Sequence, residues 1–412
     1  MLEYGPSLMM KLVQKFGGTS VGTVESIKNV AEKVRRTLDQ GNQVAVVLSA
    51  MAGETDRLIM LVNETAEIVD YREYDTVIAA GEQVSVGLLS MRLREMGIEA
   101  RSYLGWQLPI FTDNFHGKAR ITKINCAALQ SYMESGGVPV VAGFQGVGPE
   151  NRISTLGRGG SDTSAVALAV ALEADRCDIF TDVDGVYTSD PRIVAKAKKL
   201  KKITYEEMLE MASLGTKVLE TRAVEMAMKY SQRLQVLSSF GDQLGTLVVD
   251  EDEIVEQEIV SGISFSRNEA KITLVRVRDE PGVAASIFGP LAKANLNVDM
   301  IVQNTSASEG ATDITFTVPQ GDLKRALEIL TERKNDIKYE QLDSDPEVAK
   351  VSVIGVGMRS HAGVAQKMFE ALAEKGINIQ VISTSEIKVS VLIAEAYTEL
   401  AVRTLHSKYG LE

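Results

Sequence analysis

The chain has few of the residues from which disulfide frameworks and zinc clusters are built. It has two cysteines, Cys126 and Cys177, and three histidines, His116, His361 and His406. The cysteines have no metal-ligand spacing and the histidines are scattered along the chain. We therefore expect two reduced packing cysteines in a cytoplasmic protein and no protein-held metal. We assign the histidines no catalytic role and interpret His116 as part of a polar loop.

An excess of positive charge and long apolar runs are also absent. The net charge of -12 argues against nucleic acid and anionic membranes as partners, because both attract basic surfaces. No run approaches the roughly 18 apolar residues that span a bilayer. Residues 1–9 lack the pattern of a signal peptide, and we interpret them as a cloning scar or an extended start. The 412 residues lead us to expect two to three domains.

The two common glycine motifs for nucleotides do not occur: there is no G-x-x-x-x-G-K-[ST] and no G-x-G-x-x-G. A different loop is present, with the sequence Lys15-Phe16-Gly17-Gly18-Thr19-Ser20-Val21-Gly22, between a predicted strand over 12–16 and a predicted helix over 23–38. Unpaired N–H groups at a helix start attract phosphate, so the pattern predicts a phosphate cradle. A tight turn with a surface lysine is the alternative.

A second glycine-rich loop, Gly157-Arg158-Gly159-Gly160-Ser161-Asp162-Thr163, follows the apolar strand predicted over 138–143. It precedes a small-residue helix that we expect to run to about residue 171, capped by Asp162 or Thr163. The guanidinium of Arg158 suits a carboxylate or a phosphate. A plain turn is again the alternative.

A third segment, residues 180–192, runs from a strand into a loop with three aspartates, a tyrosine and an arginine. Its spacing lacks the glycine at position 6 and the distal glutamate of a calcium-binding EF-hand loop, which argues against calcium. Farther along, Lys217 lies between helical segments, where a lysine is most often a solvated charge.

Together these segments resemble the aspartate kinases of the amino acid kinase family. KFGGTSVG, GEQVS at 81–85, GRGGSD, TDVDGVYTSDPR and GTKVL occur in that family's order over essentially the whole chain. The resemblance implies transfer of the γ-phosphate of ATP to the side-chain carboxylate of L-aspartate. The product, 4-phospho-L-aspartate, enters lysine, threonine and methionine synthesis.

The chemistry requires positive charge more than a base. A carboxylate with a pKa of about 4 is already ionised at neutral pH, so the enzyme must cover the charge of the transferring phosphoryl group. Our candidates for this task are Lys15 and Lys217, with loop contacts from Gly17, Gly18 and Ser20. Asp162 resembles the family's catalytic aspartate, and we expect it to organise the phosphate-binding lysine rather than to abstract a proton.

The resemblance also implies the substrate contacts. Glu82 is expected to bind the ammonium of aspartate and Arg158 its α-carboxylate, although an exposed glutamate at a helix start is the alternative for Glu82. The other expected aspartate contacts are Ser49, Thr55 and Ser161. The ATP base and ribose are expected near Thr181, Asp182, Tyr187 and Arg192. Mg²⁺ is expected on the phosphates of ATP, since it keeps much of its hydration.

Apolar strands, predicted over 44–48, 138–142, 177–181, 234–237 and 246–249, alternate with helical patterns. Several of them lack polar alternation, as strands buried on both faces do. This order predicts a mainly parallel sheet between helix layers, with ligand loops at the carboxyl ends of the strands. The resemblance makes this the three-layer α/β/α sandwich of the amino acid kinases. We expect the catalytic domain to cover residues 1–250.

The rest of the chain repeats itself. AKITLV at 270–275 corresponds to AKVSVI at 349–354, and DITF at 313–316 corresponds to KVSV at 388–391. Each copy resembles an ACT domain, a ferredoxin-like βαββαβ regulatory module. The first copy has a closing strand predicted over 337–342, whereas the second stops after its last helix. We therefore predict that 258–263 supplies the missing strand, so that copy 1 (264–343) is inserted within copy 2 (251–263 plus 344–412).

ACT sheets commonly associate edge to edge and bind amino acids at the seam, so the resemblance implies a homo-oligomer with effector sites, with or without a short ACT-only subunit. Two units that only dimerise are the alternative. The favoured effectors are lysine and threonine. The candidate effector residues of the first copy are Asp279, in the loop between its first strand and helix, and Gln303 and Asn304, just after its second strand. Those of the second copy are Asn378, Ile379, Ser383 and Thr384. Two alternative functions are another carboxylate-phosphorylating amino-acid kinase and a catalytically dead amino-acid sensor.

Overall fold

The computed structural model describes residues 9–213, 218–254, 258–305, 310–361 and 363–412. They form two compact units. The first holds residues 9–186, 199–212 and 218–254, and the second holds Tyr187–Lys198, Ser213 and the described residues from 258 onward. This division differs from the predicted catalytic domain over 1–250 because Tyr187–Lys198 packs with the second unit.

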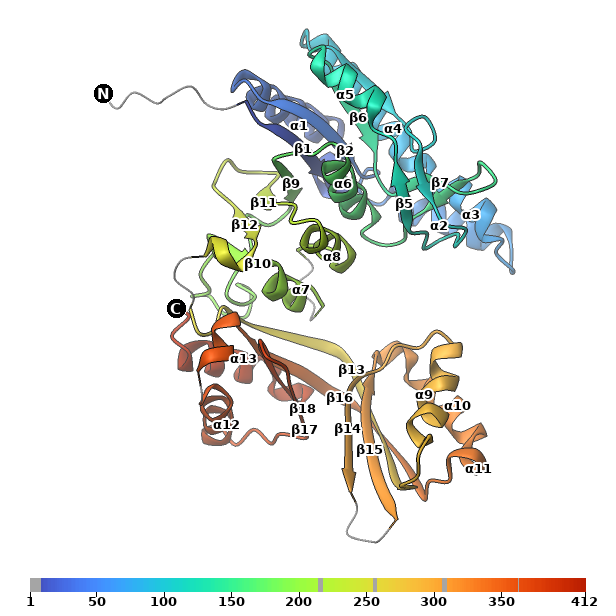
Figure 1. Ribbon diagram of the computed structural model, residues 1–412, viewed down its shortest axis with the longest axis vertical. Helices are drawn as coiled ribbons and strands as arrows, with labels where there is room; N and C mark the ends of the chain where they lie inside the picture. Colours follow the sequence, from blue (N-terminus) through green and yellow to red (C-terminus); the bar gives the residue numbers. More distant parts are fainter. Residues whose placement is uncertain (1–8, 214–217, 255–257, 306–309, 362) are drawn as a thin grey trace. The chain divides into compact units, whose positions relative to one another are not determined.

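An eight-stranded sheet with the order β10-β12-β11-β9-β1-β2-β6-β3 forms the centre of the first unit (Figure 1). All neighbours from β11 to β3 pair in parallel, whereas β12 runs antiparallel to β11. The predicted mainly parallel sheet is therefore confirmed. The strands are β1 (Lys11–Phe16), β2 (Gln43–Leu48), β3 (Ala100–Tyr103), β6 (Val138–Ala142), β9 (Arg176–Thr181), β10 (Lys202–Thr204), β11 (Leu234–Ser238) and β12 (Thr246–Val249).

Helices cover both faces of this sheet. Side chains of α1 and α4 pack with alternate residues of β2 and β6 in one core, while α5 and α6 contact the strands from the other side. Because both faces are covered, β2 and β6 are apolar almost throughout, which is why their sequences lack polar alternation. The helices are α1 (Val24–Asp39), α2 (Glu54–Thr65), α3 (Tyr71–Ile78), α4 (Ala80–Glu95), α5 (Ala127–Glu134), α6 (Gly160–Ala171), α7 (Tyr205–Ser213) and α8 (Thr221–Lys229).

A small four-stranded sheet, ordered β5-β4-β7-β8, adjoins α3 in the same unit. The sequence did not predict it, because each of its strands is only three or four residues long and so carries little periodic signal. Its strands are β4 (Ile110–Thr112), β5 (Ile121–Ile124), β7 (Gln145–Val147) and β8 (Ile153–Thr155).

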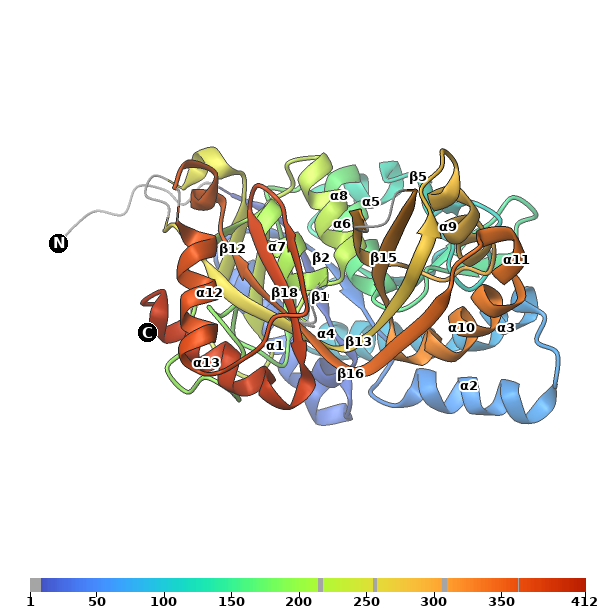
Figure 2. The same ribbon diagram turned by 90° about the horizontal axis from the view of Figure 1, so that it is seen from below.

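Both repeat copies share one six-stranded sheet in the second unit, with the order β14-β15-β13-β16-β18-β17. Two long antiparallel strands, β13 (Gly262–Arg278) and β16 (Gln341–Ile354), run through both copies (Figures 1 and 2). The other strands are β14 (Asp299–Thr305), β15 (Ala311–Val318), β17 (Val381–Thr384) and β18 (Lys388–Ala394). The helices are α9 (Val283–Lys293), α10 (Leu323–Glu332), α11 (Lys334–Ile337), α12 (Val364–Glu374) and α13 (Thr398–Lys408).

The strand missing from copy 2 is supplied from upstream of copy 1. Residues 262–266, the start of β13, pair antiparallel with 350–354 of β16. The strand begins at Gly262 rather than at 258, and residues 255–257 lie outside the described part of the chain. The closing strand of copy 1 begins at Gln341 instead of 337, because Lys334–Ile337 forms α11. None of the helices in the described ranges combines the length and apolar character that a bilayer crossing requires.

Candidate active site

The chain order of the large sheet reverses at β1, which has β2 on one side and β9 on the other. In open parallel sheets ligands bind beyond the carboxyl ends of the strands at such a reversal. The predicted phosphate loop follows β1 at this point. The loop after β2 belongs to the same unit. So does the start of α6, which follows the second glycine-rich loop.

Lys15 and Asp162 form an ion pair at this edge. Phe16 of β1 belongs to the core with α1 and α4, so the preceding residue, Lys15, faces the opposite side of the sheet. There its Nζ lies 2.6 Å from Oδ1 of Asp162, and both side chains are about nine-tenths buried. A buried lysine held by one carboxylate is a fixed positive charge.

The predicted capping role of Asp162 and Thr163 is wrong. The helix α6 starts after Gly159, whose φ of 66° is left-handed, and no side chain caps it. Instead the backbone closes the turn: the Asp162 N–H donates to Gly159 O at 3.0 Å. This leaves the Asp162 carboxylate in the first helical turn, where it faces Lys15.

The glycines of the first loop keep space around Lys15. A Cβ on Gly17 would lie 3.3 Å from Lys15 Nζ, and one on Gly18 would lie 3.1 Å from the carbonyl oxygen of Ala50. Ser20 is buried, and its hydroxyl lies 2.5 Å from that of Ser239 after β11. The loop is therefore packed against the ends of several strands rather than projecting as a surface turn.

Glu82 is buried, and a hydrogen bond is found for one of its two carboxylate oxygens. It is 2% exposed in the first turn of α4, and its Oε1 accepts a hydrogen bond from the Ala50 N–H at 3.0 Å. Within the described residues its other oxygen, Oε2, has no partner. Burial raises the pKa of Glu82 to about 8. The alternative of an exposed helix-start glutamate is therefore wrong, and the unpartnered oxygen is suited to a cation.

A close helix-to-loop approach sets the position of Glu82. A Cβ on Gly81 would lie 2.7 Å from the Cβ of Ala50, so only glycine lets α4 come this near. Ser85, one turn later, donates to the carbonyl of Ser49 at 2.8 Å. The loop 49–55 and α4 are thus joined by two hydrogen bonds, one at each of Glu82 and Ser85.

Arg158, by contrast, is exposed, and no hydrogen bond or ion pair involving it is found within the described ranges. Its guanidinium lies near Tyr74: burial raises the pKa of Tyr74, and the charge of Arg158 opposes this rise. Ser161 is buried at the start of α6, Ser49 and Thr55 are half-buried, and Thr55 lies in the first turn of α2.

The predicted nucleotide residues divide between the two units. Thr181 ends β9 in the first unit, where its hydroxyl lies 3.1 Å from Oδ1 of Asp182. Tyr187 and Arg192 belong to the second unit, and Arg192 is held against Asp190 at 2.8 Å. Lys217 lies outside the described residues. Across the described ranges, no group of three or more His, Cys, Asp or Glu side chains is arranged to hold a metal ion.

The predicted effector residues lie on the shared sheet and its loops. Gln303 and Asn304 are within β14 rather than after it, because that strand continues to Thr305. Asp279 follows β13, Asn378 and Ile379 precede β17, and Ser383 and Thr384 belong to β17. All except Ile379 and Ser383 are exposed.

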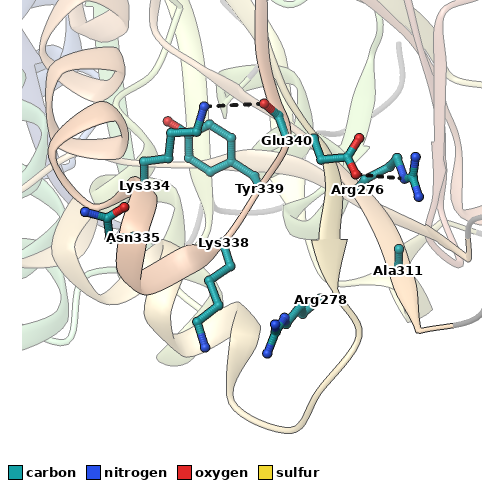
Figure 3. Close-up of a pocket in the computed structure, with 8 residues that line it drawn as sticks. All are labelled: Arg276, Arg278, Ala311, Lys334, Asn335, Lys338, Tyr339 and Glu340. Carbon is teal, nitrogen blue, oxygen red and sulfur yellow. Dashed lines mark hydrogen bonds and ion pairs between the residues drawn. The ribbon is translucent and has the colours of Figure 1, made fainter.

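A separate hollow of about 420 Å³ lies in copy 1, between the end of β13 and α11 (Figure 3). Its lining carries four cationic side chains beside one carboxylate, Glu340, which pairs with Arg276 at 3.3 Å. Arg278 and Lys338 extend toward the same open side (Figure 3). None of the residues predicted for the reaction or for effectors lines this hollow.

Sequence analysis missed one buried cluster next to the predicted substrate residues. Asp75 of α3 is fully buried and accepts hydrogen bonds from His116, Gly117 and Thr155. His116 lies in a turn between β4 and β5, as predicted, but its side chain is only 7% exposed. No spacing rule connects residues 75, 116 and 155, so only the fold brings them together.

Comparisons with known proteins find relatives that match nearly the whole chain. A model of the amino acid kinase family matches residues 10–238, and an ACT-domain model matches 272–333 and 351–409. The chain is 57% identical over 405 residues to an aspartate kinase from Stutzerimonas stutzeri strain A1501, covering 98% of each. It resembles the structure of Escherichia coli aspartokinase III with aspartate and ADP, at a TM-score of 0.78 and 28% identity over 96% of this chain and 99% of that one. The lysine and aspartate complex of that protein matches with a TM-score of 0.76 and 27% identity, over 97% and 99% of the two chains.

Proposed function

The chain belongs to the aspartate kinases of the amino acid kinase family and phosphorylates the side-chain carboxylate of L-aspartate with ATP, and from this premise we propose which residues carry the reaction. The observation that carries the proposal is the buried Lys15–Asp162 pair beside the glycine loop at the sheet reversal. The product of the reaction, 4-phospho-L-aspartate, enters lysine, threonine and methionine biosynthesis.

Lys15 supplies charge to the transferring phosphoryl group. Both reacting partners are anionic, so the barrier falls when a fixed cation faces the charge that moves between them. Asp162 holds Lys15 in place and does not act as a base, since the acceptor carboxylate is already ionised near neutral pH. Gly17, Gly18 and Ser20 line the phosphate loop. Lys217 is proposed as a second cation on the family resemblance alone.

Glu82 and Arg158 bind the two ends of aspartate that do not react. The unpartnered Oε2 of Glu82 accepts the substrate ammonium, which replaces the missing hydrogen bond and stabilises the ionised carboxylate. Arg158, exposed and unpaired within the described ranges, takes the α-carboxylate through its two parallel donors. Ser49, Thr55 and Ser161 complete this subsite.

For the nucleotide, the family resemblance supports Thr181 and Asp182 at the end of β9, and Tyr187 and Arg192 in the segment that follows. The phosphates of the ATP substrate would hold Mg²⁺, in line with its preference for water and phosphate ligands, and part of their charge would thereby be neutralised. No step is assigned to a protein-held metal.

Lysine and threonine are the proposed effectors, acting at the ACT copies. The lysine complex of E. coli aspartokinase III supports lysine, and the two-copy tail supports the pair. The proposed contacts are Asp279, Gln303, Asn304, Asn378, Ile379, Ser383 and Thr384. We propose that sheet edges of the ACT copies also join the chains of a homo-oligomer, with or without a short ACT-only subunit.

The packing of residues 187–198 supports a route from effector to nucleotide. This segment, which contains Tyr187 and Arg192, contributes Val194 to the core formed by α12, α13 and the sheet of copy 2. Ile263 of β13 donates its N–H to Thr188 O at 2.8 Å, and Arg403 of α13 donates to Ile193 O at 3.1 Å. A change of packing in copy 2 therefore acts on these two nucleotide residues directly.

A pair of substitutions on β1 tests the catalytic proposal. Lys15→Ala is expected to lower kcat at least about 100-fold, as removal of a charge-stabilising donor does. Lys11→Ala, on the same strand, removes a lysine that bonds Leu172 O and leaves kcat within about twofold. Near-normal turnover by the Lys15 variant, measured as ATP-dependent acyl phosphate formation, would refute the assignment.

A further inference from the structure

A buried carboxylate links the two halves of the proposed aspartate subsite. Asp75 is fully buried, and its oxygens accept from His116 Nδ1 at 2.7 Å, from the Gly117 N–H at 3.0 and 3.1 Å, and from Thr155 Oγ1 at 2.5 Å. These three donors come from two segments that are remote from α3 in sequence. Charge-assisted bonds of this kind are short and strong.

Each partner of Asp75 is next to a residue or loop with a proposed role. Asp75 lies on α3, which leads through Ala79 into α4 and Glu82. Gln145 fixes this junction by donating to Ala79 O at 3.1 Å. Thr155 ends β8, three residues before Arg158. One carboxylate therefore joins the helix pair that leads to Glu82 with the strand that leads to Arg158.

The turn at 116–117 is fitted to α3. Gly117 has a left-handed φ of 78°, and a Cβ there would lie 2.9 Å from the ring of Tyr71. A Cβ on Gly157 would lie 3.2 Å from Gly117 O, so this turn also borders the loop that holds Arg158. The His116 ring is 7% exposed, and its bond to Asp75 places the turn between α3 and that loop.

An arginine of another helix also holds the segments around Thr155 in place. Arg222 of α8 donates to Leu156 O at 2.6 Å and to Ala119 O at 3.0 Å. The Ala119 N–H also donates to Thr155 O at 2.9 Å, so the backbone at Thr155 and Leu156 is joined to the segment around Ala119. Arg158 itself is exposed, so its position depends on the segment that carries it rather than on contacts of its own.

We propose that Asp75, His116 and Thr155 are positioning residues for the amino-acid substrate: they hold the Arg158 loop against the α3–α4 segment and so set the spacing between the groups that bind the α-carboxylate and the ammonium of aspartate. This inference rests on the proposed roles of Glu82 and Arg158. It predicts that the network acts on aspartate binding and not on ATP binding.

The test measures steady-state KM for aspartate, KM for ATP and kcat in full-length variants. Thr155→Val and His116→Leu each remove one donor to Asp75 with little change in volume. Both are expected to raise KM for aspartate at least about 10-fold, because small displacements of a substrate clamp are costly, while KM for ATP and kcat at saturating aspartate stay within about threefold. His116→Asn, which keeps an N–H near the Nδ1 position, is expected to restore most of the affinity. Asp113→Asn, in the same hairpin but bonded only within it, is the matched control.

A double-mutant cycle separates this inference from the proposed function. If the network acts through Arg158, adding Thr155→Val to Arg158→Ala raises KM for aspartate no further. If the two effects multiply, or if only the thermal stability falls, the positioning role is wrong while the role of Arg158 stands. If Arg158→Ala alone leaves KM for aspartate unchanged, the proposed α-carboxylate site is wrong and this inference falls with it.

Discussion

The substitution Glu82→Gln removes a single buried charge at the proposed ammonium site. The amide keeps an oxygen for the Ala50 N–H, so the contact between α4 and the loop 49–55 is retained. At the position of Oε2 it places an N–H₂ group, which cannot accept from the substrate ammonium. The change therefore tests the unpartnered oxygen with little structural disturbance.

The magnitude follows from the pKa of Glu82, which burial raises to about 8. The free enzyme is then about one-tenth ionised at pH 7, and aspartate binds the ionised form. We expect log(kcat/KM) for aspartate to rise with a slope near 1 between about pH 6 and pH 7.5 and to level off near pH 8. Above pH 8, loss of a charge pair worth at least about 2 kcal/mol predicts a KM at least about 30-fold higher in Glu82→Gln.

The stability of the folded protein changes with pH in the opposite direction to kcat/KM. The pKa of Glu82 is higher in the folded than in the unfolded chain, so the folded state holds the proton longer and loses stability as pH rises from about 4.5 to about 8. Glu82→Gln removes this loss, so its Tm relative to the wild type increases over that range. Glu95→Gln, on the exposed end of the same helix, is the control. A wild-type profile in kcat/KM that is flat with pH, or one with the same slope in Glu82→Gln, would contradict the assignment.

The remaining predictions address the packing, the second anchor and the regulatory unit. Gly81→Ala is expected to lower Tm and raise KM for aspartate, because its Cβ would lie 2.7 Å from that of Ala50, whereas Gly87→Ala in the same helix has open space and is expected to raise Tm; equal effects in the two variants would contradict this. Arg158→Lys is expected to raise KM for aspartate about 10-fold with Tm unchanged, since a lysine cannot make the bidentate contact; an unchanged KM would contradict it. Burial lowers the pKa of His406, so the unfolded state takes up its proton first and the stability of the folded protein falls below about pH 6.5. In His406→Gln the difference in Tm between pH 7.5 and pH 5.5 is therefore expected to shrink. An unchanged difference would refute the contribution of His406 to the pH dependence of stability.

The sequence predicted the strands around the site closely because burial on both faces leaves a clear apolar pattern. The observed β2, β6, β9 and β12 match the predicted runs within one residue at each end. The function of the two glycine loops could also be predicted, because their motifs occur in the order of the aspartate kinases. The Lys15–Asp162 pair was foreseen from the family resemblance, and the structure adds its 2.6 Å distance and its burial.

Other features depend on contacts between distant segments and gave no local signal. The Asp75 cluster joins residues 75, 116 and 155, and nothing in a single sequence connects them. The caps proposed for α6 failed because Asp162 is used by Lys15 instead. The assignment of Tyr187–Lys198 to the second unit was missed for a similar reason, because its partners lie on β13 and α13.

The most direct test of the proposed function is acyl phosphate formation, trapped with hydroxylamine, by the full-length protein with ATP and Mg²⁺. We expect hydroxamate from L-aspartate and little from L-glutamate, loss of product in Lys15→Ala, and suppression of the wild-type reaction by lysine and threonine added together. No product from L-aspartate, or equal product from both acids, would contradict the proposed function.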